Sequence, residues 1–497
     1  MTATAAPPTA TTYRCQVSRG DRRAAPELAA PARSAGVQLP SRCTLARVKP
    51  GDRVTVTCVD LDDDGAGMTA VGDRPRVHVA GALPDERVDA LIEHVSSHAP
   101  EAWARLTAIE TPSSARRPPA CRAFGSCGGC VLQHLDYGAQ LEWKRARVAR
   151  ALAGVDVAVA PCVASPHPLG YRNRSKLVPA RFDARLVLGA YAPRSHDVVD
   201  TTGCKIAEPP LDDTAAALAA QLDAAGVTPY DEHTLMGALR HVVLRVSYDG
   251  RVLATWVTAH PLENGAALAR AFRAARPEVV GVVEHVNRGR GNAIFAPDTS
   301  DDRILDGAPT IEDCVKVRGD QVRVRLSGGA FFQANRGIAG LAYAAILNAL
   351  SPGPGERVVD AYCGVGGIAL ALARAGAGEV IGIEVHEGAV ADAVASAALN
   401  GVPGARFVAG DVARELGKID RADLVVLNPP RKGCAPEVLA EVVRLAPRAI
   451  AYLSCDPDTL GRDLAWLASR GYRLAEVTPY DMLPHTPHVE ALALLQR

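Results

Sequence analysis

The residues best suited to chemistry lie where apolar, strand-like runs end. Cys455 follows the apolar residues 449–453, and Glu490 directly precedes a final apolar run, residues 491–495. A thiolate is a good nucleophile and a carboxylate is an effective base. A cysteine after an apolar run is more often a buried small hydrophobe, and a single glutamate is more often a surface charge. The Asp-Pro pair after Cys455 favours a functional strand end, so the thiol is a candidate nucleophile.

Four earlier apolar runs also lead into polar or glycine-rich segments. Residues 358–360 enter the glycine-rich turn 362–367, and the next three runs end at Glu384, Asp411 and Asn428. Glu384 lies twenty residues after Gly364, near the spacing at which nucleotide-binding sheets place an acid for the ribose hydroxyls. A glycine turn alone could be only a tight turn. Five strand ends together predict an α/β sheet whose carboxyl ends form one crevice for a nucleotide-like cofactor.

Composition limits the class of protein. A chain of 497 residues exceeds one ordinary core, so two to four domains are expected. It has no apolar run of eighteen or more residues and no basic start before an apolar segment, which argues against a membrane or secreted protein. We expect a cytoplasmic monomer. Because the net charge is zero, any nucleic-acid contact must use local clusters of cations.

Five segments resemble the S-adenosylmethionine (SAM)-dependent RNA uracil-5-methyltransferases in order and spacing. These are residues 331–335 (FFQAN), 360–364 (DAYCG), 428–431 (NPPR), 454–460 (SCDPDTL) and 481–490 (DMLPHTPHVE). The resemblance begins near residue 44. It is closest to the 23S ribosomal RNA enzymes that carry a TRAM domain and an iron–sulfur cluster. It implies a class I, Rossmann-like methyltransferase domain whose last strand runs antiparallel.

The resemblance assigns the reaction to two residues. Cys455 would add to C6 of uracil, C5 would take the methyl group from SAM, and Glu490 would then remove the C5 proton. A helix beginning near residues 458–460 would offer backbone N–H groups that lower the pKa of the thiol. The resemblance also implies cofactor contacts from Gln333, Tyr362, Gly364, Glu384, Asp411 and Asn428, although Gln333 could simply cap the next helix.

Two positions depart from the family pattern. Asn428 stands where the family mostly has Asp, and Asp456 stands where it usually has Asn. Asn428 keeps an oxygen acceptor but loses the negative charge, so a contact there would be weaker. We expect these departures to affect substrate preference or activity level rather than the type of reaction.

Three cysteines form a compact group in a glycine-rich loop. Cys121, Cys127 and Cys130 have C-x5-C-x2-C spacing, and thiolates are the soft ligands of zinc and iron–sulfur centres. His134 could complete a zinc site at local spacing. The resemblance instead supplies Cys204 as the fourth ligand, which implies a four-iron, four-sulfur cluster.

The chain divides into four expected parts. Residues 1–43 are rich in Ala, Pro, Thr and Arg and are expected to be disordered, with no role for Cys15 or Cys43. Residues 44–105 predict an OB-like β-barrel from short alternating strands, and residues 77–86 resemble a TRAM domain. Residues 106–330 predict a central α+β domain that carries the cysteine loop. Residues 331–497 form the methyltransferase domain.

Two basic segments are candidate RNA contacts. Residues 141–152 read as an amphipathic helix with four cations, for which a solvated face is the favoured interpretation. In residues 171–176, Tyr171 stands beside three cations and could stack on a base while they bind phosphates. An ordinary exposed strand explains the second segment equally well.

The predicted activity is methyl transfer from SAM to C5 of a uridine in RNA, with 23S ribosomal RNA favoured and transfer RNA as an alternative. Methyltransferases of exocyclic amino groups share Asn-Pro-Pro but need an aromatic residue where this chain has Arg431. A non-catalytic RNA-binding protein is the third possibility, and the presence of both Cys455 and Glu490 argues against it.

Overall fold

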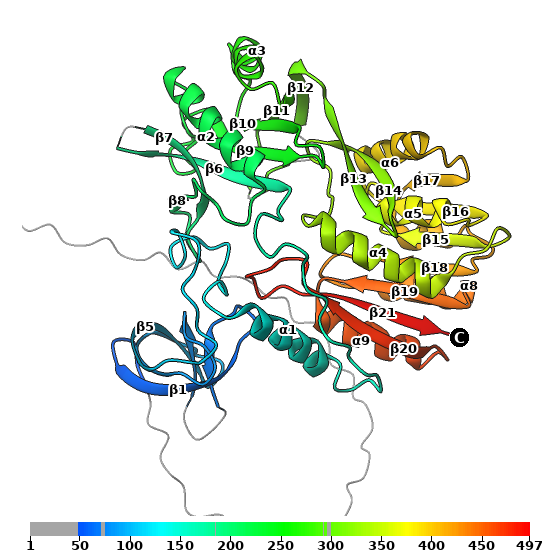
Figure 1. Cartoon of the computed structure of the whole chain (residues 1–497), viewed down its shortest axis with the longest axis horizontal. Coiled ribbons are helices and arrows are strands. Elements are labelled where there is room, and N and C mark those ends of the chain that lie inside the picture. The colour runs from blue at the N-terminus through cyan, green and yellow to red at the C-terminus, as the bar shows by residue number, and fades with distance from the viewer. Residues whose placement is uncertain (1–47, 71–74, 184, 292, 296–299) are drawn as a thin grey trace, which may run out of the picture. The chain divides into compact units, whose positions relative to one another are not determined.

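The computed structural model describes residues 48–70, 75–183, 185–291, 293–295 and 300–497 (Figure 1). All of them belong to one compact unit, Ala46–Arg497. The expected disordered tail, with Cys15 and Cys43, lies outside the described residues. The domain boundaries at residues 105 and 330 stay predictions.

The first strands form the predicted small barrel. It is closed in the order β1-β2-β3-β5-β4. Val54, Val56 and Cys58 alternate with exposed residues along the first strand and pack in the barrel core, as their period of two predicts. The last strand extends beyond residue 105. The strands are β1 (Arg53–Leu61), β2 (Gly67–Thr69), β3 (Arg76–Ala80), β4 (Arg87–Val95) and β5 (Glu101–Thr111).

The middle of the chain forms a seven-stranded sheet in the order β12-β11-β10-β9-β6-β7-β8. Strands β9 and β10 form an antiparallel pair in this sheet. Helices α2 and α3 contribute to one apolar core with this sheet, as expected for an α+β domain. The elements are β6 (Arg174–Phe182), β7 (Arg185–Tyr191), β8 (Val198–Asp200), α2 (Pro209–Ala224), β9 (Leu239–Val246), β10 (Val252–Thr258), α3 (Gly265–Ala275), β11 (Val279–Asn287) and β12 (Ser300–Gly307).

The C-terminal sheet has the expected α/β topology, in the order β17-β16-β15-β18-β19-β21-β20. Neighbours from β17 to β19 are parallel, and β21 runs antiparallel between β19 and β20. Strands β18 and β19 are buried throughout, as in sheets covered on both faces. The strands are β15 (Arg357–Ala361), β16 (Glu379–Glu384), β17 (Ala405–Ala409), β18 (Leu424–Leu427), β19 (Ala449–Ser454), β20 (Arg473–Tyr480) and β21 (Glu490–Gln496).

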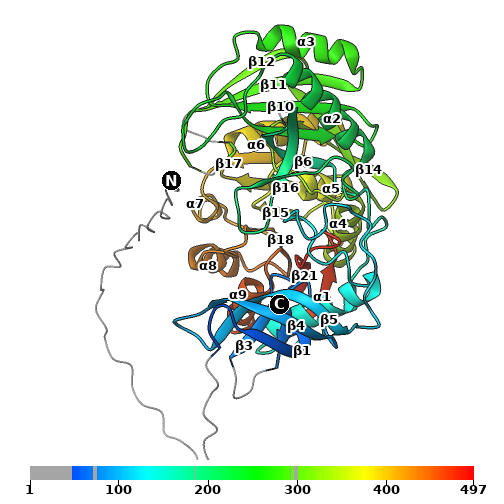
Figure 2. The same cartoon turned by 90° about the vertical axis from the view of Figure 1, so that its left-hand side faces the viewer.

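Helices cover both faces of this sheet, as Figure 2 shows from the side. One apolar core contains residues of α4, α5, α6 and the β13–β14 hairpin, and the other contains residues of α1, α7, α8 and α9. The elements not yet given are α1 (Tyr137–Ala151), β13 (Thr310–Val317), β14 (Asp320–Ser327), α4 (Arg336–Leu350), α5 (Gly367–Arg374), α6 (Glu387–Asn400), α7 (Val412–Leu416), α8 (Pro436–Leu445) and α9 (Pro457–Ala468).

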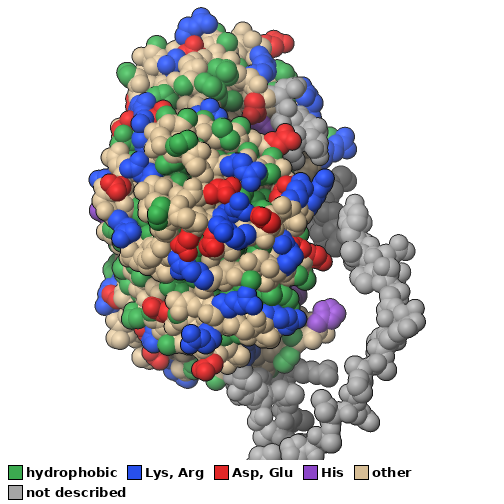
Figure 3. Space-filling model, turned by 90° about the vertical axis from the view of Figure 1, so that its right-hand side faces the viewer, with side chains coloured by type: hydrophobic (Ala, Val, Ile, Leu, Met, Phe, Trp, Pro, Cys, Tyr) green, Lys and Arg blue, Asp and Glu red, His purple; other side chains and the backbone are tan. Residues whose placement is uncertain are grey.

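Acidic and basic side chains share the visible surface. On the face shown in Figure 3, Lys and Arg side chains are interspersed with Asp and Glu side chains. Across the described segments, no helix is both long enough and apolar enough to cross a bilayer.

Candidate active site

The glycine-rich turn lies where the strand order of the C-terminal sheet reverses. Strand β15 pairs in parallel with β16 on one side and with β18 on the other, and open α/β sheets bind ligands in the crevice at such a point. The turn after β15 needs left-handed backbone at Tyr362, Gly364 and Gly366, with φ of 64°, 54° and 85°. A Cβ atom on Gly366 would lie 2.8 Å from the Phe407 ring, so only glycine fits there without displacement.

The buried carboxyl group of Asp360 binds the helix that follows this turn. Asp360 is the second-last residue of β15, and its Oδ2 accepts the N–H of Ala369 in the first turn of α5 at 2.9 Å. Burial raises the pKa of Asp360 to about 7, and the neighbouring Glu384 adds to the rise. Asp360 therefore links β15 to the first turn of α5, on either side of the glycine-rich turn.

Cys455 and Glu490 lie at the same edge of the sheet. In the antiparallel pair β19–β21, Ser454 is the register partner of Ala491. Cys455 is the next residue after one partner and Glu490 is the residue before the other, so the two reach the same strand end. Both are half-buried.

The charges around these two groups are coupled. Burial raises the pKa of Cys455 to about 11, the Glu490 carboxylate adds to the rise, and the Arg431 guanidinium opposes it. Burial also raises the pKa of Glu490 to about 7, again against the effect of Arg431. At pH 7 the neutral thiol of Cys455 therefore predominates strongly over the thiolate. A carboxyl group with a pKa near 7 suits general base catalysis at neutral pH.

The expected activation of the thiol by the following helix is wrong. Helix α9 does begin at Pro457, but its N-cap is Asp456, whose side chain accepts the N–H groups of Asp458 and Thr459. Those donors are already satisfied, and the negative charge of Asp456 raises the pKa of Cys455 further. The same observation explains the departure at residue 456, because Asn and Asp are about equally good N-caps.

Three of the predicted cofactor residues meet at the glycine-rich turn. The N–H of Gly364 donates to Oε2 of Glu384 at 3.1 Å, and the N–H of His386 donates to Oε1 at 3.0 Å. Burial, together with the neighbouring Cys434 and the charge of Asp411, raises the pKa of the Tyr362 phenol. Asp411 is exposed and caps α7 by accepting the N–H of Arg414 at 3.0 Å. This grouping is consistent with a nucleoside site beside the turn.

Two further predicted cofactor residues, Gln333 and Asn428, are at least half-buried and form backbone hydrogen bonds. Asn428 follows β18, is half-buried, and donates its backbone N–H to Ala361 at 3.3 Å. Gln333 is buried, and its backbone carbonyl accepts from Nδ2 of Asn173 at 2.9 Å. It does not cap the next helix, because Asn335 does so. Contacts from these two side chains to a cofactor stay predictions.

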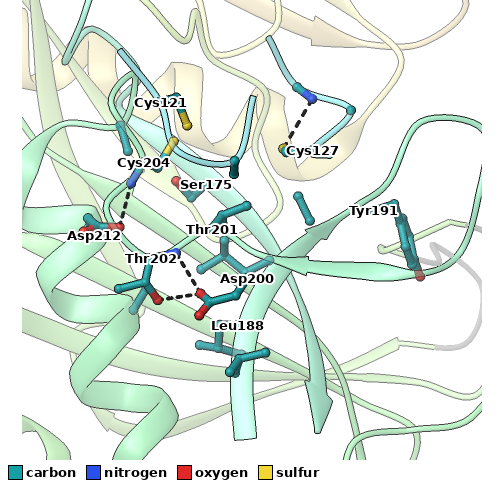
Figure 4. A pocket seen from close by; sticks show the side chains of 18 of the residues that line it. Cys121, Cys127, Ser175, Leu188, Tyr191, Asp200, Thr201, Thr202, Cys204 and Asp212 are labelled. Carbon is teal, nitrogen blue, oxygen red and sulfur yellow. Dashed lines mark hydrogen bonds between the residues drawn. The ribbon is translucent and has the colours of Figure 1, made fainter. Parts of the chain in front are cut away.

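The four predicted cluster ligands line one cavity of about 1000 Å³. Figure 4 labels three of them, Cys121, Cys127 and Cys204. Burial raises the pKa of Cys130 to about 12, with added contributions from Cys204, Cys127 and Cys121. The sulfur of Cys127 also accepts the N–H of Gly129 at 3.4 Å. Within the described residues, no three His, Cys, Asp or Glu side chains are arranged to hold a single metal ion.

The zinc alternative with His134 gains no support from the geometry. His134 is buried against Phe124, with ring centroids 4.9 Å apart. Burial lowers its pKa to about 4, as does the nearby Arg116, while Glu86 opposes the shift. His134 therefore faces side chains other than the thiols. Four soft sulfur donors suit either an iron–sulfur cluster or one zinc ion, so the identity of the centre stays a prediction.

The solvated-face interpretation of the basic helix is wrong for two of its cations. Lys144 is fully buried, where its Nζ forms an ion pair with Asp481 and donates to the Leu483 carbonyl at 3.1 Å. Arg147 binds Asp63 at 2.6 Å and Asp458 at 2.6 Å. These side chains hold α1 to the loop before Glu490 and to the start of α9.

Tyr171 is also unavailable for the base stacking considered above. It is 4% exposed, and its hydroxyl donates to the Pro484 carbonyl at 3.1 Å. Arg174 directs its guanidinium to the carbonyls of Ala330 and Gly328 at 3.1 and 3.3 Å. This segment therefore supports the neighbouring loops, and any phosphate contact must come from the remaining donors.

Comparison with known proteins identifies the family. A family model described as tRNA (Uracil-5-)-methyltransferase matches residues 295–497. RNA methyltransferases of Geobacter sulfurreducens and Gloeobacter violaceus are 40% and 36% identical to the chain, each over 90% of it and over 90% and 97% of their own lengths. The structure of a Pyrococcus abyssi tRNA (uracil-54, C5)-methyltransferase with S-adenosyl-L-homocysteine is 26% identical, with a TM-score of 0.71, covering 89% of this chain and 100% of that chain. The chain therefore belongs to the SAM-dependent RNA (uracil-5-)-methyltransferase family.

Proposed function

We propose that this enzyme methylates C5 of a uridine in RNA through a covalent bond between Cys455 and C6 of the uracil. The observation that carries the proposal is the meeting of Cys455 and Glu490 at one end of the β19–β21 pair. The electrostatic coupling of both groups to each other and to Arg431 is further support. An amino-group methyltransferase would need no thiol at this position.

In the proposed reaction Cys455 is the nucleophile and Glu490 is the base. Bound SAM supplies an electrophilic methyl group. The Cys455 sulfur attacks C6, and the electron pair of the C5–C6 double bond moves into an enolate that makes C5 nucleophilic. C5 takes the methyl group as the bond from that methyl to the sulfonium sulfur breaks, which leaves S-adenosylhomocysteine, and Glu490 then accepts the C5 proton. The electron pair of the C5–H bond restores the double bond and expels the Cys455 thiolate.

The cofactor is proposed to bind along the glycine-rich turn. Glu384 would accept hydrogen bonds from the ribose hydroxyls, since it stands at the end of the second strand beside Gly364. Tyr362 and Gly364 would line the cofactor, and Asp411 would lie near the adenine. Gln333 and Asn428 would complete the site.

We favour 23S ribosomal RNA as substrate, from the resemblance to enzymes with a TRAM domain and a cluster. Transfer RNA is the second candidate, because the family model and the Pyrococcus abyssi structure are both named for tRNA methylation. That structure covers 89% of this chain, which is too large a share to leave out the barrel. The barrel alone therefore does not discriminate between the two substrates.

Mapping 5-methyluridine in cells with and without the gene tests the substrate. We expect one uridine in 23S RNA to lose its methyl group when the gene is deleted, and purified enzyme with SAM to restore it in the unmodified RNA. A loss confined to transfer RNA would replace the favoured substrate. Unchanged 5-methyluridine in both RNAs, with methyl transfer to an amino group, would reject the proposed reaction.

We also propose that Cys121, Cys127, Cys130 and Cys204 hold a four-iron, four-sulfur cluster. Anaerobically purified protein should be brown and contain about four iron atoms and four sulfides per chain. Cys204→Ser should lower both contents, whereas substitution of Cys314, a buried cysteine in β13, should not. Colourless protein that contains zinc would reject the cluster.

A further inference from the structure

Three side chains of α9 hold the loop that carries Arg431. Thr459 donates its hydroxyl to the Arg431 carbonyl at 3.1 Å. Arg462 donates from Nη2 to the carbonyls of Lys432 and Cys434 at 3.1 and 3.3 Å. Residues 459, 462 and 463 share one face of the helix because they are three and four positions apart. One helical face thus binds most of the backbone of residues 431–434.

Asp463 is the buried centre of this contact. It is 1% exposed, and its Oδ2 accepts the N–H of Cys434 at 2.9 Å and the hydroxyl of Tyr452 at 2.6 Å. Its Oδ1 accepts from Nε of Arg462 at 2.8 Å. Since Tyr452 lies in β19, the carboxylate joins the loop, the helix and the strand that leads to Cys455.

The loop of residues 431–434 lies so close to α9 that residue 433 has no room for a side chain. Gly433 has a φ of 72°, and a Cβ atom there would lie 2.5 Å from Nη2 of Arg462 and 2.7 Å from Oδ2 of Asp463. The fit between loop and helix is therefore specific to this backbone path. Arg431 enters that path directly from the Pro429-Pro430 pair.

We propose that Asp463 is a positioning residue for methyl transfer, which fixes the loop of residues 431–434 so that the Arg431 guanidinium stays beside Cys455 and Glu490. This inference rests on the proposed role of Cys455 as nucleophile. Arg431 is the cation that opposes the raised pKa of both groups. If the loop loses its anchor on α9, Arg431 moves away, and the Cys455 thiolate becomes rarer.

The test measures the reactivity of Cys455 without RNA. Full-length enzyme is treated with iodoacetamide between pH 7 and 10.5, and the labelling rate of the Cys455 peptide is followed by mass spectrometry. The groups that set this profile are Glu490 on β21, Arg431 on the loop and Asp456 at the helix cap. Asp463→Ala should lower the labelling rate at pH 9 about three- to tenfold, since a nearby charge shifts a pKa by about one unit in a partly solvated site.

Two further variants separate positioning from general stability. Arg431→Gln should lower the rate by a similar factor, and the double variant should add little, because both changes remove one interaction. Asp423→Ala removes a comparable carboxylate–backbone contact at the other end of the strands, to the N–H of Arg357 at 2.7 Å. This control should leave the labelling of Cys455 unchanged.

The inference fails if folded Asp463→Ala labels Cys455 at the wild-type rate or faster, or if its effect adds fully to that of Arg431→Gln. Should Asp463→Ala not fold, Thr459→Val removes only one donor to the loop and should still slow labelling about twofold. Asp463→Asn keeps an acceptor for Cys434 and should recover part of the rate. Because the probe is iodoacetamide, a wrong RNA substrate would not alter any of these results.

Discussion

Glu490 should control the second half of the reaction through its raised pKa. With a pKa of about 7, this carboxyl group is about 90% ionised at pH 8 and about 10% ionised at pH 6. Only the ionised form can accept the C5 proton. Release of the methylated RNA from Cys455 should therefore slow about tenfold between pH 8 and pH 6.

The substitution Glu490→Gln removes the base at every pH. A positioned base contributes roughly a hundred- to ten-thousand-fold to the rate, so release should slow by that factor. Removal of the carboxylate also removes a cause of the raised pKa of Cys455, so formation of the covalent bond should not suffer. The methylated RNA–protein adduct should then accumulate.

A pH-jump experiment measures this step by itself. The adduct is formed with wild-type enzyme, RNA and SAM during a single turnover, moved to a pH between 5.5 and 8.5, and sampled on denaturing gels. The decay rate should rise with pH and level off above about pH 8. Decay that is independent of pH, or normal turnover by Glu490→Gln without an adduct, would refute the assigned role.

Three further substitutions test the supporting structure. The pKa of Asp360 is about 7 in the folded protein, against 3.8 for a free side chain, so the free energy of unfolding should fall as the pH rises between these values. Asp360→Asn keeps an acceptor for Ala369 and should remove up to about 4 kcal/mol of this cost at pH 8. Urea unfolding measures the difference. Gly366→Ala should cost at least about 1–2 kcal/mol because of its φ of 85° and the Phe407 contact, and calorimetry should show weaker SAM binding. Lys144→Met should cost about 3–5 kcal/mol by leaving Asp481 buried without its partner, and Lys144→Met with Asp481→Leu should recover most of that loss.

Much of the C-terminal sheet could be predicted because its central strands are short, continuous apolar runs that end in polar residues. Strand β20 was not predicted. Only Val477, Pro479 and Tyr480 are buried in it, and a proline at the edge of a sheet breaks the usual strand pattern. The antiparallel direction of β21 was implied by the family resemblance, and this direction brings Glu490 to the same strand end as Cys455.

The incorrect predictions concern side chains or N–H groups whose binding partners could not be inferred from local spacing. The partner of Lys144 is 337 residues further along the chain, and the acceptor for Tyr171 is 313 residues away. Amphipathic spacing shows neither contact. At α9 the competitor is local, since Asp456 takes the N–H groups that were expected to stabilise the Cys455 thiolate. Arg431 was considered only as a missing aromatic residue, although its place after the Asn-Pro-Pro strand end could have marked it as part of the site.

The most direct measurement is the mass of the Cys455 peptide after Glu490→Gln enzyme has reacted with SAM and the substrate RNA, followed by nuclease and protease digestion. We expect a uridine carrying one added methyl group, attached to Cys455 and to no other cysteine. Methylated RNA formed by the wild-type enzyme, together with an unmodified Cys455 peptide in the variant and full activity of Cys455→Ala, would contradict covalent catalysis at this residue.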